Sequence, residues 1–157
     1  MLVIGKAEYE DIRCHGEERY PHECCGVLLG AISGNRKIVS RVVRCTNTRG
    51  QAARTRYNID PRELIDIQRQ AREHGESILG FYHSHPDAPP HWSRTDLDQA
   101  YWPDCSYIIV SVLAGNASEM TSFVLEGADA DRRFLTELLE VVEHDRRERS
   151  AIIDYNQ

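Results

Sequence analysis

The sequence predicts a mixed α/β (α+β) fold: a single domain in which helices flank a mixed β-sheet. The 157 residues match the length of one ordinary domain, and a content of 41% hydrophobic and 28% charged residues is typical of globular proteins. Residues 106–113 (SYIIVSVL) form a near-continuous apolar run, which favours a strand inside a sheet. Residues 60–74 (DPRELIDIQRQAREH) combine helix start signals with apolar residues at helical spacing. We therefore expect both kinds of element in one domain.

The N-terminal part of the chain is expected to form a helix followed by a β-hairpin. Residues 7–19 (AEYEDIRCHGEER) are a helix candidate that ends before Pro21. Residues 24–30 (CCGVLLG) are a short apolar run closed by glycine, and residues 36–45 (RKIVSRVVRC) are rich in β-branched residues. Both are expected to be strands, and the SGN sequence between them is typical of a hairpin turn.

The helix over 60–74 has clear signals at both ends. Asp60 is the expected N-cap, Pro61 takes the first helical position, and Glu63 follows the cap by three residues. Gly75 is expected to stop the helix. The apolar residues at helical spacing are Leu64, Ile67 and Ala71.

The second half of the chain is expected to continue with strands and one short helix. A strand over 77–85 (SILGFYHSH) leads into a proline-rich loop, and a helix over 94–102 (RTDLDQAYW) is expected to end at the following proline. Residues 119–126 (EMTSFVLE) alternate in polarity. We expect them to pair with the strand at 106–113 through the AGNAS turn.

Residues 131–144 are predicted to form a last helix. Four apolar residues lie on one face of it: Phe134, Leu135, Leu138 and Val142. The final dozen residues are highly charged. We therefore place the domain at residues 1–145 and expect residues 146–157 to be a charged, disordered C-terminal tail.

Charge and hydropathy exclude several classes of partner. The formal net charge of −6 argues against general binding to nucleic acid. No apolar run approaches the roughly 20 residues of a membrane span, so no membrane partner is expected. The N-terminus lacks the apolar region of a signal peptide, which indicates a cytoplasmic protein. Oligomeric state is left open by the sequence.

The charge is unevenly distributed along the chain. Residues 36–56 contain six arginines and one lysine and no acidic residue. One interpretation is a solvated strand face and loop, and the other is a surface that steers an acidic partner protein.

The cysteines do not indicate a disulfide framework or a structural zinc site. Their number is odd and they include no C-x-x-C pair, which favours neither a disulfide framework nor a zinc finger. We expect free thiols that are mostly buried. The five residues are Cys14, Cys24, Cys25, Cys45 and Cys105.

Residues 83–96 (HSHPDAPPHWSRTD) contain the most informative motif of the sequence. Side chains two residues apart on a strand share a face, so His83 and His85 are expected to point into one small volume at a strand end. Asp96, in the first turn of the next helix, can supply a carboxylate oxygen as a third ligand. Such a set binds Zn²⁺ and leaves the fourth position to water, as in catalytic zinc sites.

Each part of this motif also has a purely structural interpretation. The two histidines can be ordinary surface residues at a strand end. Ser93 and Asp96 form the S-x-x-D pattern of a helix capping box, which needs no chemistry. Because the histidines, the proline turn and the carboxylate occur together, the metal interpretation is favoured.

The same stretch carries a resemblance to a known family. HSHP (83–86) and SRTD (93–96) resemble the JAMM signature, H-x-H-P followed by S-x-x-D. That signature marks the MPN+ metalloproteases, also called Mov34/MPN/PAD-1 or JAB-domain proteins. YPHECCGVLLG offers the family's upstream glutamate as Glu23, and YNIDP and DLDQAYWPDCSYIIVSV resemble the small stand-alone prokaryotic members. The resemblance covers roughly residues 1–126.

The resemblance implies a site and a mechanism. It implies a single MPN/JAB-like domain, layered as in cytidine deaminases, with one Zn²⁺ per chain held by His83, His85 and Asp96. It also implies that Glu23 activates a zinc-bound water, as general base and then general acid. Ser93 is implied to donate a hydrogen bond to the oxyanion.

The implied function is that of a JAMM-type zinc metallopeptidase. Its substrate would be a ubiquitin-like or sulfur-carrier protein, cut at a peptide or isopeptide bond at the C-terminus. Two alternatives stay open: a non-catalytic MPN scaffold for protein–protein interaction, and a metal-dependent amidohydrolase of small molecules. A zinc deaminase is disfavoured, because its H-x-E and P-C-x-x-C elements are missing.

Overall fold

The computed structural model of the protein describes residues 1–50 and 58–143. In chain order the elements are β1 (Leu2–Gly5), α1 (Lys6–Arg19), β2 (Cys25–Ser33), β3 (Arg36–Cys45), α2 (Pro61–Glu73), β4 (Ser77–Pro86), α3 (Arg94–Asp98), β5 (Ser106–Leu113), β6 (Asn116–Glu126), the 3₁₀ turn η2 (Asp129–Asp131), β7 (Arg133–Glu137) and β8 (Leu139–Val142). Both long helices and the five strands predicted up to residue 126 are present. Strand β1 was not among the predicted elements.

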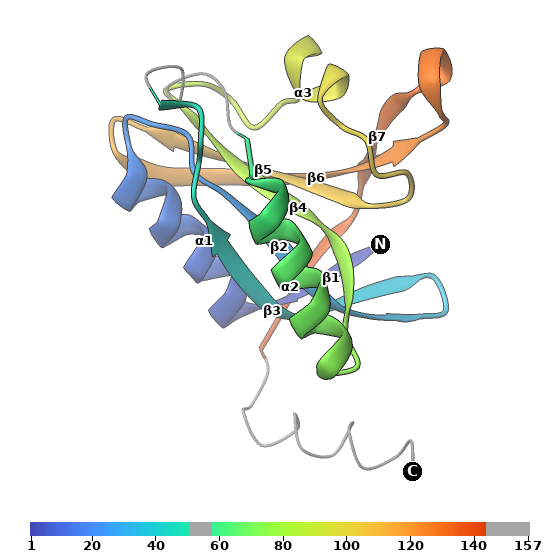
Figure 1. The fold of residues 1–157 in the computed structure, drawn as a ribbon. Coiled ribbons are helices and arrows are strands. Elements are labelled where there is room, and N and C mark those ends of the chain that lie inside the picture. Colours follow the sequence, from blue (N-terminus) through green and yellow to red (C-terminus); the bar gives the residue numbers. More distant parts are fainter. Residues whose placement is uncertain (51–57, 144–157) are drawn as a thin grey trace.

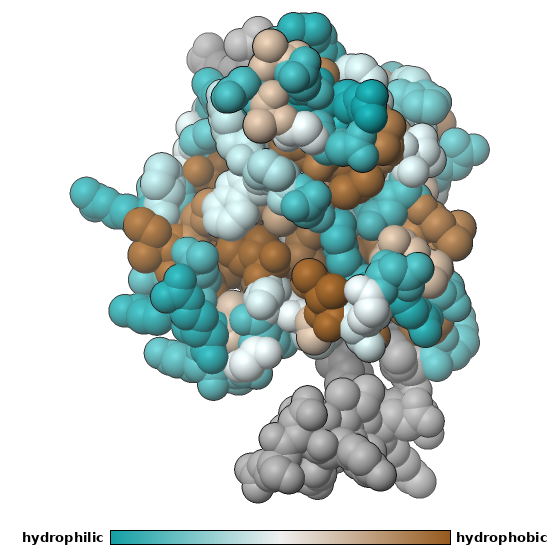
Figure 2. Space-filling view, turned by 90° about the vertical axis from the view of Figure 1, so that its right-hand side faces the viewer, coloured by the Kyte–Doolittle hydropathy of each residue, from teal (hydrophilic) through white to brown (hydrophobic). Residues whose placement is uncertain are grey.

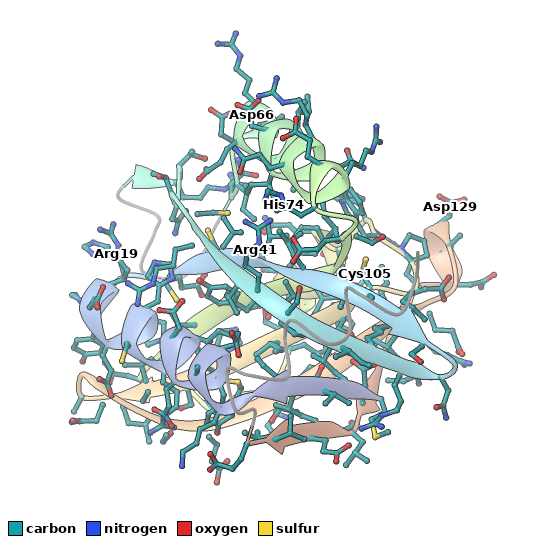
Figure 3. All side chains as sticks on the ribbon, turned by 90° about the horizontal axis from the view of Figure 1, so that it is seen from below. Arg19, Arg41, Asp66, His74, Cys105 and Asp129 are labelled. Carbon is teal, nitrogen blue, oxygen red and sulfur yellow. The ribbon has the colours of Figure 1, made fainter. Side chains whose placement is uncertain are left out.

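The strands form one mixed sheet in the order β7-β6-β5-β4-β2-β3-β1-β8. Strand β1 runs parallel to β3 and β8, and β4 runs parallel to β5, whereas the other neighbours are antiparallel. Helices α1 and α2 cover opposite faces of the sheet (Figure 1). The end-on view of Figure 3 shows the same arrangement, with Arg19 on α1 and Asp66 on α2 on opposite sides of the strands. The predicted mixed α/β fold with flanking helices is confirmed.

Successive residues of the central strands enter two separate cores. On the α2 side, Ile67 of the helix packs in one cluster with Phe81 of β4. On the α1 side, Ile12 of the helix packs in a second cluster with Tyr82, the next residue of β4. Side chains alternate between the faces of a strand, so β4 serves both cores, and from Phe81 onward its odd-numbered residues face α2.

The predicted helix over 131–144 is wrong. Strand β7 pairs with β6 and β8 pairs with β1, so one stretch of chain adds to both ends of the sheet. The four apolar residues do not share a buried face: Phe134 is 8% exposed and Leu138 is 67% exposed. The backbone N–H and C=O groups at the outer sides of β6 and β1 need hydrogen-bond partners. Pairing with β7 and β8 satisfies these groups, and this gain outweighs the local preference of the segment for a helix.

Strand β7 and the tip of the β2–β3 hairpin leave hydrophobic side chains on the surface. Figure 2 shows the side of the molecule on which β7 and the tip of the β2–β3 hairpin lie, and hydrophobic side chains gather there between hydrophilic ones. The exposed large hydrophobic residues of these elements and of the β7–β8 junction are Ile32, Leu135 and Leu138.

One predicted helix boundary is confirmed and another is wrong. The N-cap of α2 is as predicted, since the Asp60 carboxylate accepts a hydrogen bond from the backbone N–H of Arg62 at 2.8 Å. Helix α3 ends at Asp98, although a helix over 94–102 was predicted. The chain leaves the helix because Trp102 packs on Phe81, with ring centroids 5.5 Å apart, and this burial outweighs helix propensity.

The predicted tail, residues 146–157, lies outside the described residues, and the domain boundary at residue 145 stays a prediction. Within residues 1–50 and 58–143, no helix has the length and apolar character that a membrane crossing requires.

Candidate metal centre

Two strand residues and one helix residue bring three donor atoms together. His83 and His85 lie on β4 with their Nε2 atoms 3.1 Å apart. Asp96 lies on α3, with Oδ1 3.1 Å from His83 Nε2 and Oδ2 3.4 Å from His85 Nε2. All three side chains are 11% exposed or less. The structure therefore places the three predicted ligands in one small, largely buried volume.

The histidines sit on a well-supported part of the sheet. His83 is paired with Cys25 of β2 on one side and with Ile109 of β5 on the other. His85 is paired with Ser111 of β5. The backbone of His83 is therefore fixed by strands on both sides, and that of His85 by its pairing with β5.

A second contact sets the tautomer of His85. Its Nδ1 lies 3.1 Å from the carbonyl oxygen of Pro89. A carbonyl can only accept a hydrogen bond, so Nδ1 carries the proton and donates it. In the neutral ring, Nε2 then presents its lone pair toward the donor cluster, which is the orientation that a metal ligand requires.

Helix α3 begins with a complete capping box. The Ser93 hydroxyl oxygen accepts a hydrogen bond from the backbone N–H of Asp96 at 3.2 Å, and the Asp96 carboxylate accepts one from the Ser93 backbone N–H at 2.5 Å. The structural interpretation of S-x-x-D is thus correct. It does not compete with the metal interpretation, since the cap fixes the carboxylate of Asp96 in front of the two histidines.

The charges in the cluster favour an ionised carboxylate. Burial alone raises the pKa of Asp96, but its interactions with His83 and His85 outweigh burial and hold that pKa well below its usual range. Burial lowers the pKa of His83, partly offset by the Asp96 carboxylate. For His85 burial acts in the same direction, yet Asp96 outweighs it and raises the pKa. An anionic oxygen is therefore present at any physiological pH.

The donor set fits a tetrahedral metal ion. In a tetrahedral zinc site with bonds of about 2.0–2.1 Å, the ligand atoms lie about 3.3–3.4 Å from one another. The two imidazole nitrogens lie 3.1 Å apart, and each lies 3.1 or 3.4 Å from a different oxygen of the Asp96 carboxylate. Two imidazoles and one carboxylate are also ligand types that Zn²⁺ prefers, and a fourth position is left without a protein ligand in this set.

Glu23 lies beside this cluster, immediately before β2. Its side chain is 5% exposed, and burial raises its pKa to about 8, with His85 lowering and Asp96 raising it. Its backbone is held from two sides. The Asn47 side-chain amide donates to the Glu23 carbonyl oxygen at 3.1 Å, and the next N–H, of Cys24, donates to the Ser84 hydroxyl at 2.8 Å.

An aromatic groove of about 380 Å³ lies on the α2 side of the sheet, the side that the ligands also face, although none of the ligands lines it. Its floor includes Phe81, which precedes His83 by two residues and so faces the same side of β4. Tyr101 and Trp102 line it from the loop after α3, and Arg49 adds a cation. The sequence alone indicates no role for Phe81, Tyr101 or Trp102. The aromatic residues of AYWPDCSY were the available signal, but their role depends on a loop that the sequence predicted as helix.

The basic segment over 36–56 is largely neutralised where the structure describes it. All four cationic residues of β3 pair with acids: Arg36 with Glu140, Lys37 with Glu137, Arg41 with Glu76, and Arg44 with Asp11 and Glu18. Figure 3 shows Arg41 on the side of the sheet that α2 covers, near His74. The solvated strand face is thus the better interpretation of β3. Residues 51–56 of this segment, which include Arg54 and Arg56, lie outside the described residues.

Geometry and fold together define a candidate metal site at the end of an inner strand of a mixed sheet. Residues 6–126 match the Prok-JAB family, the prokaryotic homologs of the JAB domain. The chain belongs to this family.

Several curated proteins and solved structures are similar to this chain. A CysO-cysteine peptidase of Mycobacterium tuberculosis is 31% identical over 129 residues, which are 82% of this chain and 86% of the relative. The desampylase of Haloferax volcanii is 36% identical over 91 residues, 58% of this chain and 63% of the relative. The chain thus spans less than two thirds of that protein.

The solved structures agree on the fold. A protein from Desulfitobacterium hafniense superposes with a TM-score of 0.80 at 28% identity, over 94% of this chain and 97% of the other. A JAB1/MPN domain protein from Archaeoglobus fulgidus superposes with a TM-score of 0.58 at 17% identity, over 91% and 98% of the two chains. The expected MPN/JAB-like fold is confirmed.

Proposed function

We propose that this protein is a zinc-dependent metallopeptidase that cleaves a peptide or isopeptide bond at the C-terminus of a ubiquitin-like or sulfur-carrier protein. The observation that carries the proposal is the convergence of His83, His85 and Asp96 within 4.8 Å, with the buried Glu23 carboxyl next to them. A metal site with an adjacent buried carboxyl matches the chemistry of hydrolysis. The relatives named desampylase and CysO-cysteine peptidase support the substrate class.

His83, His85 and Asp96 are the residues that hold the ion in this proposal. Zinc bound there supplies a Lewis acid that polarises the scissile carbonyl and makes water acidic enough to attack near neutral pH. The Pro89 carbonyl and the capping box of α3 orient the ligands before any ion binds. The chain therefore supplies a preorganised site.

Glu23 moves the proton. Its carboxylate accepts a proton from the attacking water and returns it to the nitrogen of the leaving amine. Burial raises the pKa of this carboxyl to about 8, so the protonated form is stable enough to act as the acid in the second step. A bound divalent cation shifts the balance back toward the carboxylate, which the first step needs.

Ser93 donates to the oxyanion. Its hydroxyl oxygen uses a lone pair to cap α3, because it accepts the N–H of Asp96. A hydroxyl has one proton and two lone pairs, so the proton stays available for a second hydrogen bond. Capping and oxyanion stabilisation are therefore compatible in one side chain.

The aromatic groove is the expected seat of the substrate's tail. An extended C-terminal tail reaching the ligands passes the residues that adjoin them, and Phe81 and Trp102 offer apolar walls to a side chain near the cleaved bond. A folded partner with a flexible tail suits such an open groove better than a compact small molecule does.

The decisive experiment follows cleavage by intact mass. Purified protein loaded with zinc is incubated with ubiquitin-like and sulfur-carrier proteins that carry C-terminal extensions, and with small acyl amides. Removal of an extension, lost on chelation and regained with zinc, supports the proposal. Turnover of the small amides alone would favour the amidohydrolase, and a protein that binds carriers without zinc and without cleavage would favour the scaffold.

A further inference from the structure

Helix α3 carries one proposed ligand and is anchored to the core along its length by a single hydrophobic side chain. It has five residues, Arg94–Asp98, none of them fully buried, and of these Leu97 packs against the α2-side core. Isolated helices of this length do not form in water, because the entropy lost in ordering the first turn exceeds the free energy gained from its few hydrogen bonds. The position of Asp96 therefore depends on the Leu97 contact, on the capping box and on contacts at the two ends of α3.

The C-terminal end of α3 is held by Arg132, which follows η2 in the β6–β7 connection. The Arg132 guanidinium donates a hydrogen bond to the carbonyl oxygen of Ala100 at 2.5 Å. Ala100 is 1% exposed, and its N–H donates to the Leu97 carbonyl of α3 at 3.2 Å. A cation at this end also favours the orphan carbonyls and the dipole of the last helical turn.

Arg132 is itself fixed by two further contacts. Its Nε donates to the carbonyl oxygen of Asp129 at 3.1 Å, within its own turn. Its guanidinium carbon lies 5.3 Å from the ring centroid of Tyr101, the residue after Ala100. Figure 3 labels Asp129 in this turn, at the edge of the molecule. The arginine thus links the β6–β7 connection to the loop that follows α3.

The N-terminal end of α3 is held by Phe134 of β7, which lies two residues after Arg132 in the chain. Trp92 directly precedes the N-cap Ser93, and its ring lies 5.8 Å from the ring of Phe134. Phe134 is 8% exposed and contacts Tyr107 of β5, with centroids 5.1 Å apart. The N-terminal end of α3 is therefore packed against the core through Phe134.

From these contacts we infer that the β6–β7 connection positions Asp96 for metal binding, and that Arg132 is the positioning residue at its centre. The inference rests on the proposed function, since it concerns the same site. The family match ends at residue 126. Arg132 and Phe134 lie beyond it, so the chain uses a segment outside the family pattern to hold a ligand inside that pattern.

The test compares variants of two neighbouring arginines. Arg133 is exposed and pairs with Glu126, so Arg133→Ala is a matched control for Arg132→Ala. Zinc affinity is measured by competition with a chromophoric chelator. We expect Arg132→Ala to weaken zinc binding roughly 10-fold or more, as for other residues that orient metal ligands, and Arg133→Ala to leave it within about two-fold. Arg132→Lys keeps the cation and should restore part of the loss.

A second readout does not depend on zinc. Amide hydrogen exchange of residues 94–100 in metal-free protein should be faster in Arg132→Ala than in wild type, with the central strands unchanged. Tyr101→Ala removes the ring that the guanidinium packs on but leaves the Ala100 contact, so it should weaken zinc binding less than Arg132→Ala does. Unchanged exchange and unchanged affinity in Arg132→Ala would overturn the inference. A wild type that fails to bind zinc would instead refute the proposed function, while the exchange comparison still decides the role of Arg132.

Discussion

Two buried histidine environments lie on opposite faces of β4. On the α1 side, Nδ1 of His15 lies 2.7 Å from the hydroxyl of Tyr82, and both side chains are buried. On the α2 side, His83 faces His85 and the carboxylate of Asp96. Tyr82 and His83 are consecutive residues, so a single strand supports both arrangements.

The difference shows what makes a buried histidine a ligand candidate. His15 meets a neutral hydroxyl, and burial together with the charge of Arg44 lowers its pKa to about 4. The pair is a satisfied polar contact within a core. His83 shares its volume with a second imidazole and an ionised carboxylate, which a cation can bridge. Burial is common to both, so the partners make the difference.

The largest expected effect is the loss of zinc in Asp96→Ala. The change removes one of three proposed ligands and the carboxylate that caps α3. We expect zinc content to fall from one per chain to background, and cleavage to fall with it. The matched control is His15→Gln on the other face, which should retain zinc. Zinc is measured by elemental analysis after gel filtration, and one zinc per chain in Asp96→Ala would contradict the ligand assignment.

Glu23→Gln should separate metal binding from catalysis. The amide fills the same space but accepts no proton at neutral pH, so we expect unchanged zinc content and a kcat roughly 10²–10⁴-fold lower. Initial rates on a cleavable carrier protein measure the effect. Cleavage at the wild-type rate by zinc-loaded Glu23→Gln would rule out the proposed proton transfer.

Ser93→Ala should have a smaller effect on two properties. Losing the oxyanion donor is expected to reduce kcat by about 10²-fold, with KM little changed. Losing the cap is expected to cost about 1 kcal/mol of stability. Ser93→Thr keeps the hydroxyl and should restore most of both. Kinetics and thermal unfolding of the three proteins provide the measurement, and equal kcat in wild type and Ser93→Ala would remove serine from the mechanism.

The smallest expected effect concerns His15 on the α1 side, and it changes only the pH dependence of the free energy of unfolding. The pKa of His15 is lowered to about 4 in the folded state, from 6.5 in the unfolded chain. As pH falls from 6.5 to 4, the unfolded state takes up the proton first, so stability decreases, by up to about 3 kcal/mol. His15→Gln should lose this part of the pH dependence. Urea unfolding at pH 7 and pH 4.5 compares the two proteins, and an equal drop in both would argue against a neutral, buried His15.

Local patterns in the sequence were sufficient for most of the fold. The Asp60 cap, the β-branched run over 36–45 and the apolar run over 106–113 each determine their own element, because the interactions involved are local. The segment over 131–144 was predicted as a helix because its partners, β6 and β1, are distant in sequence. Strand addition at the ends of a sheet leaves no strong local signal.

The residues of the candidate site also differ in how far they could be predicted from local sequence. His83, His85 and Asp96 could be grouped from the sequence, since thirteen positions separate the first from the last and a strand, a turn and a cap connect them. Glu23 came only from the family resemblance, because its proximity depends on the pairing of β2 with β4. Arg132 and Asn47 act through backbone carbonyls, and such contacts have no sequence signature.

The central claim is that the α2-side histidines form a hydrolytic zinc site. Its most direct test is the intact mass of a ubiquitin-like carrier with a C-terminal extension, followed over time with zinc-loaded, chelated and zinc-restored enzyme. We expect the zinc-loaded enzyme to remove the extension, the chelated enzyme to leave the carrier unchanged, and added zinc to restore cleavage. Cleavage that continues at the same rate without metal would contradict it.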